Sequence, residues 1–171
     1  MMENTNNKTE TRLRKDLIET FEQVKKSVRR TEKRSRAGLM LGLQEMGSTL
    51  SGFIGGYYPV DSNIIVLNRT PLRRIEETDL LLLKPYAFHV MLHEYIHSLG
   101  LLDEEATRRK TYDVSVACFG VDHIITQLST DMTKFFPNLV YPVYGWNPPQ
   151  QPAPVEIIRG FDRSNTQQYI A

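Results

Sequence analysis

The stretch that decides the fold is "PYAFHVMLHEYIHSLGLLDEEA", residues 85–106, which predicts a buried helix followed by a sharp turn. Pro85 suits the first turn of a helix, because the N–H that it lacks would have no partner there. Gly100 suits the end of the helix, since glycine tolerates the left-handed conformation common at helix ends. We therefore expect a helix from about Pro85 to Leu99, with a broad apolar surface supplied by Phe88, Met91, Leu92, Tyr95, Ile96 and Leu99.

Two histidines on this helix have the spacing of metal ligands. His93 and His97 lie one turn apart, so that both imidazoles can reach one ion at about 2.1 Å. Glu94, beside the first histidine, can act as general base toward a metal-bound water without being a ligand itself. The metal lowers the pKa of that water toward neutrality, and the resulting hydroxide attacks a carbonyl. His89 is too far along the helix from His97 to share the ion, since eight residues rise about 12 Å. We expect it to line the cleft, to support a ligand from behind, or simply to be packed in the core.

The segment from His93 onward reads H-E-x-x-H-x-x-G-x-x-D and resembles the zincin metallopeptidases. It is most similar to the metzincin motif, with Asp103 in place of the usual third histidine, and this resemblance implies that Asp103 is the third zinc ligand. The helical character after Asp103 is similar instead to the gluzincins, whose third ligand is a glutamate on a second helix. That similarity implies that Glu104 or Glu105 binds zinc and that Asp103 is an N-cap. Asp103 is the preferred ligand and Glu104 the next choice, followed by Glu105 and His123.

The resemblance also implies a group that stabilises the oxyanion, because several zincins use a His, Tyr or Arg outside the motif for this purpose. His123, in "GVDHIIT", is the first candidate, and Tyr112, Arg108 and Arg109 are weaker ones. Metzincins place a methionine turn beneath the metal, for which Met132 in "TDMTKF" is the candidate.

The remainder of the chain predicts an α+β fold. A helix is expected from Thr11, because Leu13, Leu17, Phe21, Val24 and Val28 recur at helical spacing, and residues 1–10 are expected to be disordered. "NIIVLN" (63–68) is β-branched and predicts a strand, which we expect to be the edge strand that aligns a substrate. We thus expect a compact zincin-like domain over residues 11–136, with a small sheet packed on the active-site helix and backing helices.

Residues 137–171 contain six of the nine prolines and several aromatic residues, which predicts an extended segment docked on the domain. Such a segment can make a protease latent by lying along the edge strand of the cleft. On that hypothesis Asp162 or the terminal carboxylate approaches the metal.

Composition narrows the class of protein. The single cysteine, Cys118, excludes an internal disulfide and is typical of a reducing compartment. The longest apolar run, Leu80–Leu83, is too short to cross a membrane, and the first ten residues lack the apolar core of a signal peptide. We expect a cytoplasmic protein with no membrane association and of unassigned oligomeric state.

The sequence therefore predicts a zinc metallopeptidase that acts on peptides or proteins. The alternative is a metal-binding, non-proteolytic module that uses the basic segment Lys25–Arg36 to bind nucleic acid or a partner protein. Glu94 argues against that alternative, since a structural metal site needs no base beside its first ligand. A zinc hydrolase of small amides or esters would use the same chemistry, and other divalent ions bind similar sites.

Overall fold

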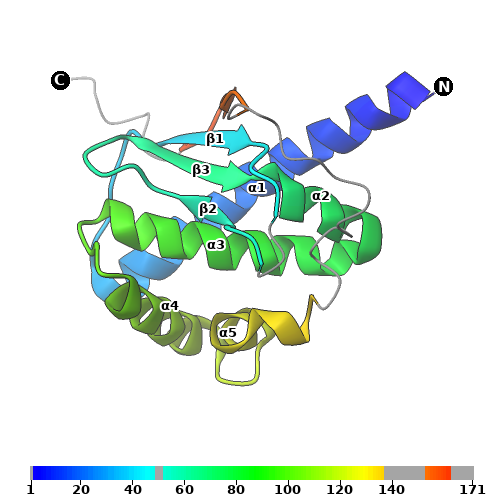
Figure 1. Cartoon of the computed structure of the whole chain (residues 1–171). Helices are drawn as coiled ribbons and strands as arrows, with labels where there is room; N and C mark the ends of the chain where they lie inside the picture. The colour runs from blue at the N-terminus through cyan, green and yellow to red at the C-terminus, as the bar shows by residue number, and fades with distance from the viewer. Residues whose placement is uncertain (1, 49–51, 137–152, 163–171) are drawn as a thin grey trace.

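The computed structural model describes residues 2–48, 52–136 and 153–162, and these form an α+β fold (Figure 1). The helices are α1 (Met2–Glu32), α2 (Arg69–Thr78), α3 (Leu83–Ser98), α4 (Glu104–Phe119) and α5 (Ile124–Thr130), with short 3-10 turns η1 (Leu80–Leu82) and η2 (Met132–Lys134). The strands are β1 (Met40–Gln44), β2 (Gly56–Tyr57), β3 (Ile64–Asn68) and β4 (Glu156–Ile158). Among these helices, none combines the length and the apolar composition required to traverse a membrane.

The four strands form one mixed sheet in the order β2-β3-β1-β4. β1 and β3 are parallel, with Met40 opposite Ile64, and each outer strand runs antiparallel to its neighbour. β3, which is the "NIIVLN" strand, is therefore internal, and the edge on its side of the sheet is β2. Ile65, Val66 and Leu67 are all buried, as is typical of a strand covered on both faces.

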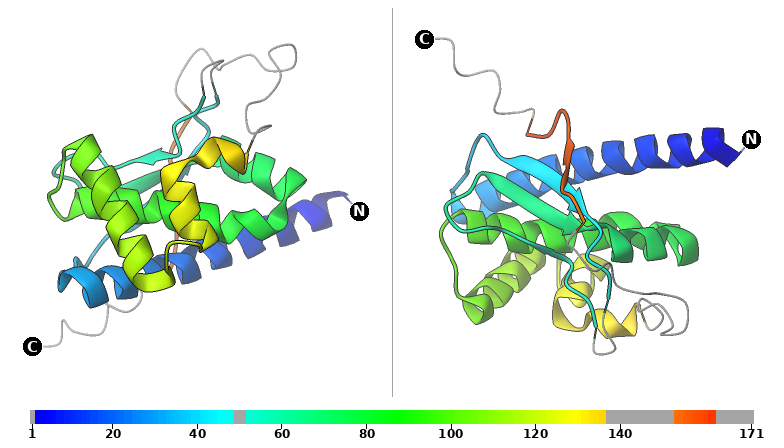
Figure 2. Two further views of the ribbon diagram at one scale, coloured as in Figure 1. Left: turned by 90° about the horizontal axis from the view of Figure 1, so that it is seen from below. Right: turned by 45° about the horizontal axis from the view of Figure 1, so that its top comes forward.

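α3 is the central element of the molecule. It lies between the sheet on one side and α4 and α5 on the other, with α1 beside it (Figures 1 and 2). Twelve of its sixteen residues are buried. A helix that is apolar around its whole circumference is typical of a core position. The motif residues of α3 are therefore fixed by packing on several sides.

α1 begins at Met2, whereas the sequence predicted disorder over residues 1–10. Its inner face is buried from Leu13 to Val28, as the apolar spacing predicted. Residues 4–9 are exposed and polar, so no apolar period could reveal the helix there. Extending a helix that has already formed adds a hydrogen bond per residue and needs no new nucleus, which accounts for the longer element.

The described part of the C-terminal segment, residues 153–162, packs at the edge of the sheet opposite β2. β4 pairs with β1, and the ring of Phe161 stacks on Phe21 with centroids 3.9 Å apart. The Asp162 carboxylate forms a buried ion pair with Lys25 and accepts the Leu39 N–H at 3.1 Å. Asp162 is therefore held by Lys25 and Leu39 and is not among the side chains that could share a metal with His93 and His97, contrary to the hypothesis from the sequence. The rest of that hypothesis concerns residues 137–152 and 163–171, which lie outside the described residues.

Candidate metal centre

Three side chains converge where α3 meets α4. The ligand atoms of His93, His97 and Glu104 all lie within 4.8 Å of one another. The Glu104 carboxylate oxygens are 3.2 Å from His93 Nε2 and 2.9 Å from His97 Nε2. Two ligands of one tetrahedral zinc ion, each about 2.0–2.1 Å from it, would be about 3.3 Å apart. Two imidazole nitrogens and a carboxylate thus form a group that could hold a metal ion.

The turn between α3 and α4 decides which acid joins the histidines. Gly100 reverses the chain with a φ of 105°, and its N–H donates to the His97 carbonyl at 2.9 Å. Asp103 then caps α4, because its carboxylate accepts the Ala106 N–H at 2.7 Å. This leaves Glu104 as the first residue of the helix, facing α3. Asp103, the preferred ligand from the sequence, is therefore the N-cap, and the next choice, Glu104, lies with the histidines.

The remaining acid of the turn is directed elsewhere. Glu105 is exposed and pairs with Arg109 at 3.1 Å on the outer side of α4. Glu104 is thus the carboxylate of this turn that meets His93 and His97.

The orientation of His97 is fixed by a second set of contacts. Its Nδ1 lies 2.7 Å from the Leu101 carbonyl oxygen, and the hydroxyl of the fully buried Thr107 is 3.3 Å from the same nitrogen. A proton on Nδ1 satisfies the carbonyl and leaves the lone pair of Nε2 directed at Glu104. A backbone carbonyl that holds the outer nitrogen of a histidine is a common second-layer contact in metal sites.

Glu94 lies next to the three converging side chains but is not one of them. Its side chain is buried at 7% exposure, and its carboxylate accepts the backbone N–H of Tyr58. Burial raises the pKa of the Glu94 carboxyl to about 7, an effect that Glu104 reinforces and that His97 opposes. A carboxylate whose pKa is near neutrality can both accept and return a proton at physiological pH.

The two histidines nearest the cavity favour the neutral form. Burial lowers the pKa of His93, although the neighbouring Glu104 opposes this shift. Burial also lowers the pKa of His89 to about 4. A neutral imidazole is the form that binds metals.

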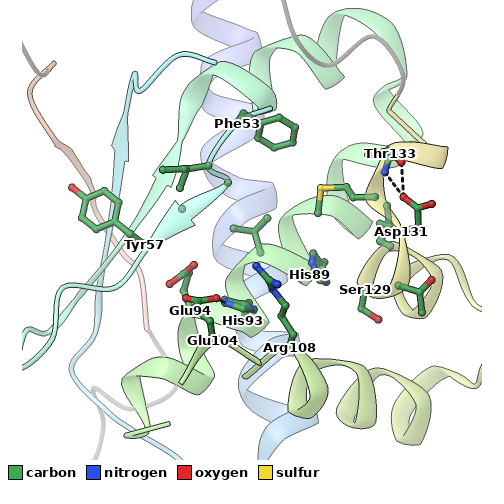
Figure 3. A pocket seen from close by; sticks show the side chains of 17 residues that line it. Phe53, Tyr57, His89, His93, Glu94, Glu104, Arg108, Ser129, Asp131 and Thr133 are labelled. Atoms are coloured by element: carbon green, nitrogen blue, oxygen red, sulfur yellow. Dashed lines mark hydrogen bonds and ion pairs between the residues drawn. The ribbon is translucent and has the colours of Figure 1, made fainter. Parts of the chain in front are cut away.

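A cavity of about 880 Å³ opens beside this group (Figure 3). α3 contributes His89, Val90, His93 and Glu94, and the opposite walls are residues 53–57 and residues 128–133. A second hollow of about 430 Å³ lies on the other side of His97, against Tyr58 and Gly100. The candidate metal group therefore sits between two depressions of the surface.

The other candidates from the sequence occupy different places. His123 is the N-cap of α5, where its Nδ1 accepts the Ile125 N–H, and its exposed ring stacks on Phe119. It does not line the cavity, so the structure does not bring it to the position of an oxyanion stabiliser. Arg108, named from the sequence only as a weaker candidate, does line the cavity, as does Met132. Arg108 follows Glu104 by one helical turn, a spacing that would have identified it had Glu104 been chosen.

The basic segment Lys25–Arg36 is only partly a free surface. Lys25 is buried against Asp162, and Arg34 donates to the Leu99 carbonyl. Arg36 donates to the Tyr58 hydroxyl and to the carbonyls of Ser62 and Ser98. Three of the seven basic residues thus help to hold the fold.

Comparison with models of protein families, with curated proteins and with solved structures finds no match to this chain.

Proposed function

We propose that the protein is a zinc-dependent hydrolase of peptide bonds. The observation that carries this proposal is the convergence of His93, His97 and Glu104 beside a buried Glu94 at the mouth of a cavity. A zinc ion held by these residues would supply a Lewis acid that polarises a carbonyl and makes water more acidic. Two neutral imidazoles and a carboxylate are a common ligand set for catalytic zinc.

On this proposal, residues of the chain orient His97 and transfer the protons of the reaction. Leu101 and Thr107 hold His97 in the tautomer that presents Nε2. Glu94 takes the proton of the attacking water and delivers it to the leaving amine. Its burial keeps bulk water away and holds the pKa of its carboxyl near neutrality, which suits a group that must gain and lose a proton in each cycle.

The surroundings suit a peptide. Ligand-binding cavities commonly measure about 300–1,000 Å³, and the cavity here is about 880 Å³. One of its walls includes β2, which is an edge strand among the described residues and can pair with an extended chain. The alternative of a nucleic-acid-binding module is less favoured, because the basic segment is partly committed to internal contacts.

The test combines metal analysis with hydrolysis. The purified chain, its Glu94→Gln variant and a Glu105→Gln control are dialysed, assayed for zinc, and incubated with a pool of quenched fluorescent peptides. We expect close to one zinc per chain in all three proteins. Hydrolysis should fall about 10²–10⁴-fold in Glu94→Gln alone, because general-base catalysis is worth that much. A wild-type chain that binds no added zinc, or a Glu94→Gln variant that remains fully active, would overturn the proposal.

A further inference from the structure

The cationic side chain in the cavity lining is Arg108, and it differs from the two basic residues that follow it in its ion pairing. Arg108, Arg109 and Lys110 follow one another on α4, and two of them are paired: Arg109 with Glu105 and Lys110 with Glu32, each at 3.1 Å. Arg108 has no ion pair or side-chain hydrogen bond with any residue that the structure describes. Its side chain points into the cavity, near the metal group (Figure 3).

The polar groups on the wall formed by residues 128–133 already have hydrogen-bond partners. The hydroxyls of Ser129 and Thr130 donate to the carbonyls of Thr126 and Gln127, at 2.6 Å and 2.7 Å. On the same wall the Asp131 carboxylate accepts from the backbone N–H and the hydroxyl of Thr133.

His89 is the other polar side chain of the lining with no hydrogen bond to the described residues, and its Nδ1 is buried without a partner. Glu94 and Glu104 belong to the candidate metal centre. The positive charge that the cavity lining offers to a ligand is therefore that of Arg108, with the His89 ring as a further polar contact.

We propose that Arg108 binds a carboxylate of the substrate, and that the protein prefers peptides carrying one beside the cleaved bond. This inference rests on the proposed function and names its substrate class. A guanidinium matches a carboxylate through two parallel hydrogen bonds, which adds direction to the charge attraction. Arg108 lies one helical turn, about 5.4 Å, from Glu104. One or two residues of extended peptide, at about 3.3 Å each, span that separation.

The carboxylate has two sources, the chain terminus or an aspartate or glutamate side chain, and three probes separate them. They are fluorescein-labelled pentapeptide pools of otherwise uncharged residues, ending in a free carboxylate, ending in an amide, or ending in an amide with one internal glutamate. Binding to the Glu94→Gln protein is measured by fluorescence anisotropy, with zinc and again after chelation. Arg108→Met removes the charge, Arg108→Lys keeps the charge without the planar fork, and Arg109→Met is the matched control.

We expect at least one acidic pool to bind about tenfold more tightly than the amidated pool, as for a charge-assisted hydrogen bond. The preferred pool identifies the source of the carboxylate. Arg108→Met should abolish the preference, Arg108→Lys should retain part of it, and Arg109→Met should leave it unchanged. The preference should also persist after chelation, so that it supports the inference even if the chain binds no zinc and the proposed function fails.

Two results would overturn the inference. A preference that survives Arg108→Met and disappears on chelation would mean that the carboxylate binds the metal. The second result would come from hydrolysis by the protein with Glu94 intact. There, Arg108→Met would lower kcat by the same factor for acidic and for amidated substrates, and the ratio of their kcat/KM values would stay unchanged. Arg108 would then act on the reacting carbonyl oxygen rather than on a substrate carboxylate.

Discussion

Replacing Asp103 and Glu104 separately with alanine tests which of these adjacent acids is the metal ligand. Asp103 caps α4, whereas Glu104 meets both histidines. Asp103→Ala removes a single cap hydrogen bond, which is worth about 1 kcal/mol. For a chain of this size that loss lowers the Tm by about 2–4 °C, equally with and without zinc. Glu104→Ala removes no cap, so without zinc its Tm should change by less than that of Asp103→Ala.

With zinc bound, Glu104→Ala should lower the Tm more than Asp103→Ala does. Loss of a contact in the second layer already lowers metal affinity about 10–100-fold, so loss of a ligand should reach at least the upper end of that range. A hundredfold weaker affinity removes about 2.7 kcal/mol of zinc-dependent stabilisation at a fixed excess of zinc. The Tm of Glu104→Ala should then fall about 5–10 °C below that of the zinc-loaded wild type.

Scanning fluorimetry with and without zinc, supported by calorimetric titration of the metal, distinguishes these patterns. The zinc-dependent rise in Tm should survive in Asp103→Ala and be largely lost in Glu104→Ala. The reasoning is refuted if Asp103→Ala loses the rise while Glu104→Ala keeps it, because Asp103 would then be the ligand.

Three further outcomes follow from the packing. Asp162→Ala should lower the free energy of unfolding in urea by about 2–3 kcal/mol, because it removes one of the two carboxylates that pair with the buried Lys25 and the acceptor of the Leu39 N–H; a loss below about 1 kcal/mol would contradict this. Gly56→Ala should destabilise the chain by about 1–3 kcal/mol, since its Cβ would lie 2.7 Å from the Val66 carbonyl oxygen; an unchanged urea midpoint would show that β2 can shift. Burial lowers the pKa of His89 to about 4 in the folded chain, so the unfolded chain binds its proton first as the pH falls. Zinc-free stability should therefore decline between about pH 6.5 and pH 4, by up to about 3 kcal/mol, and His89→Gln should flatten that decline in urea titrations.

The parts of the fold that depend on local pattern could be predicted from the sequence. The helix expected from Pro85 to Leu99 is α3, observed from Leu83 to Ser98, and Gly100 makes the turn after it. These features depend on residues within a few positions of one another, where apolar period and backbone preference decide. The polar start of α1 was missed because it presents no apolar face.

Features that depend on distant segments could not be predicted. The strand "NIIVLN" was recognised, but its internal position depends on β1 and β2, which the sequence did not identify. His123 was considered for the cleft, yet the turn before α5 uses it as a helix cap. Arg108 could be placed in the cavity only once the direction of α4 relative to α3 was known.

The sequence by itself determined that His93 and His97 share one face of a helix with Glu94 beside them, because a spacing of four residues fixes that geometry in any α-helix. It also determined that an acid follows the turn at Gly100. Only the tertiary structure decided which acid this is, since Asp103 and Glu104 are adjacent and both suit the start of a helix. α4 begins at Glu104 and packs against α3. The Asp103 carboxylate therefore accepts a backbone N–H as the N-cap, while the Glu104 carboxylate faces the histidines.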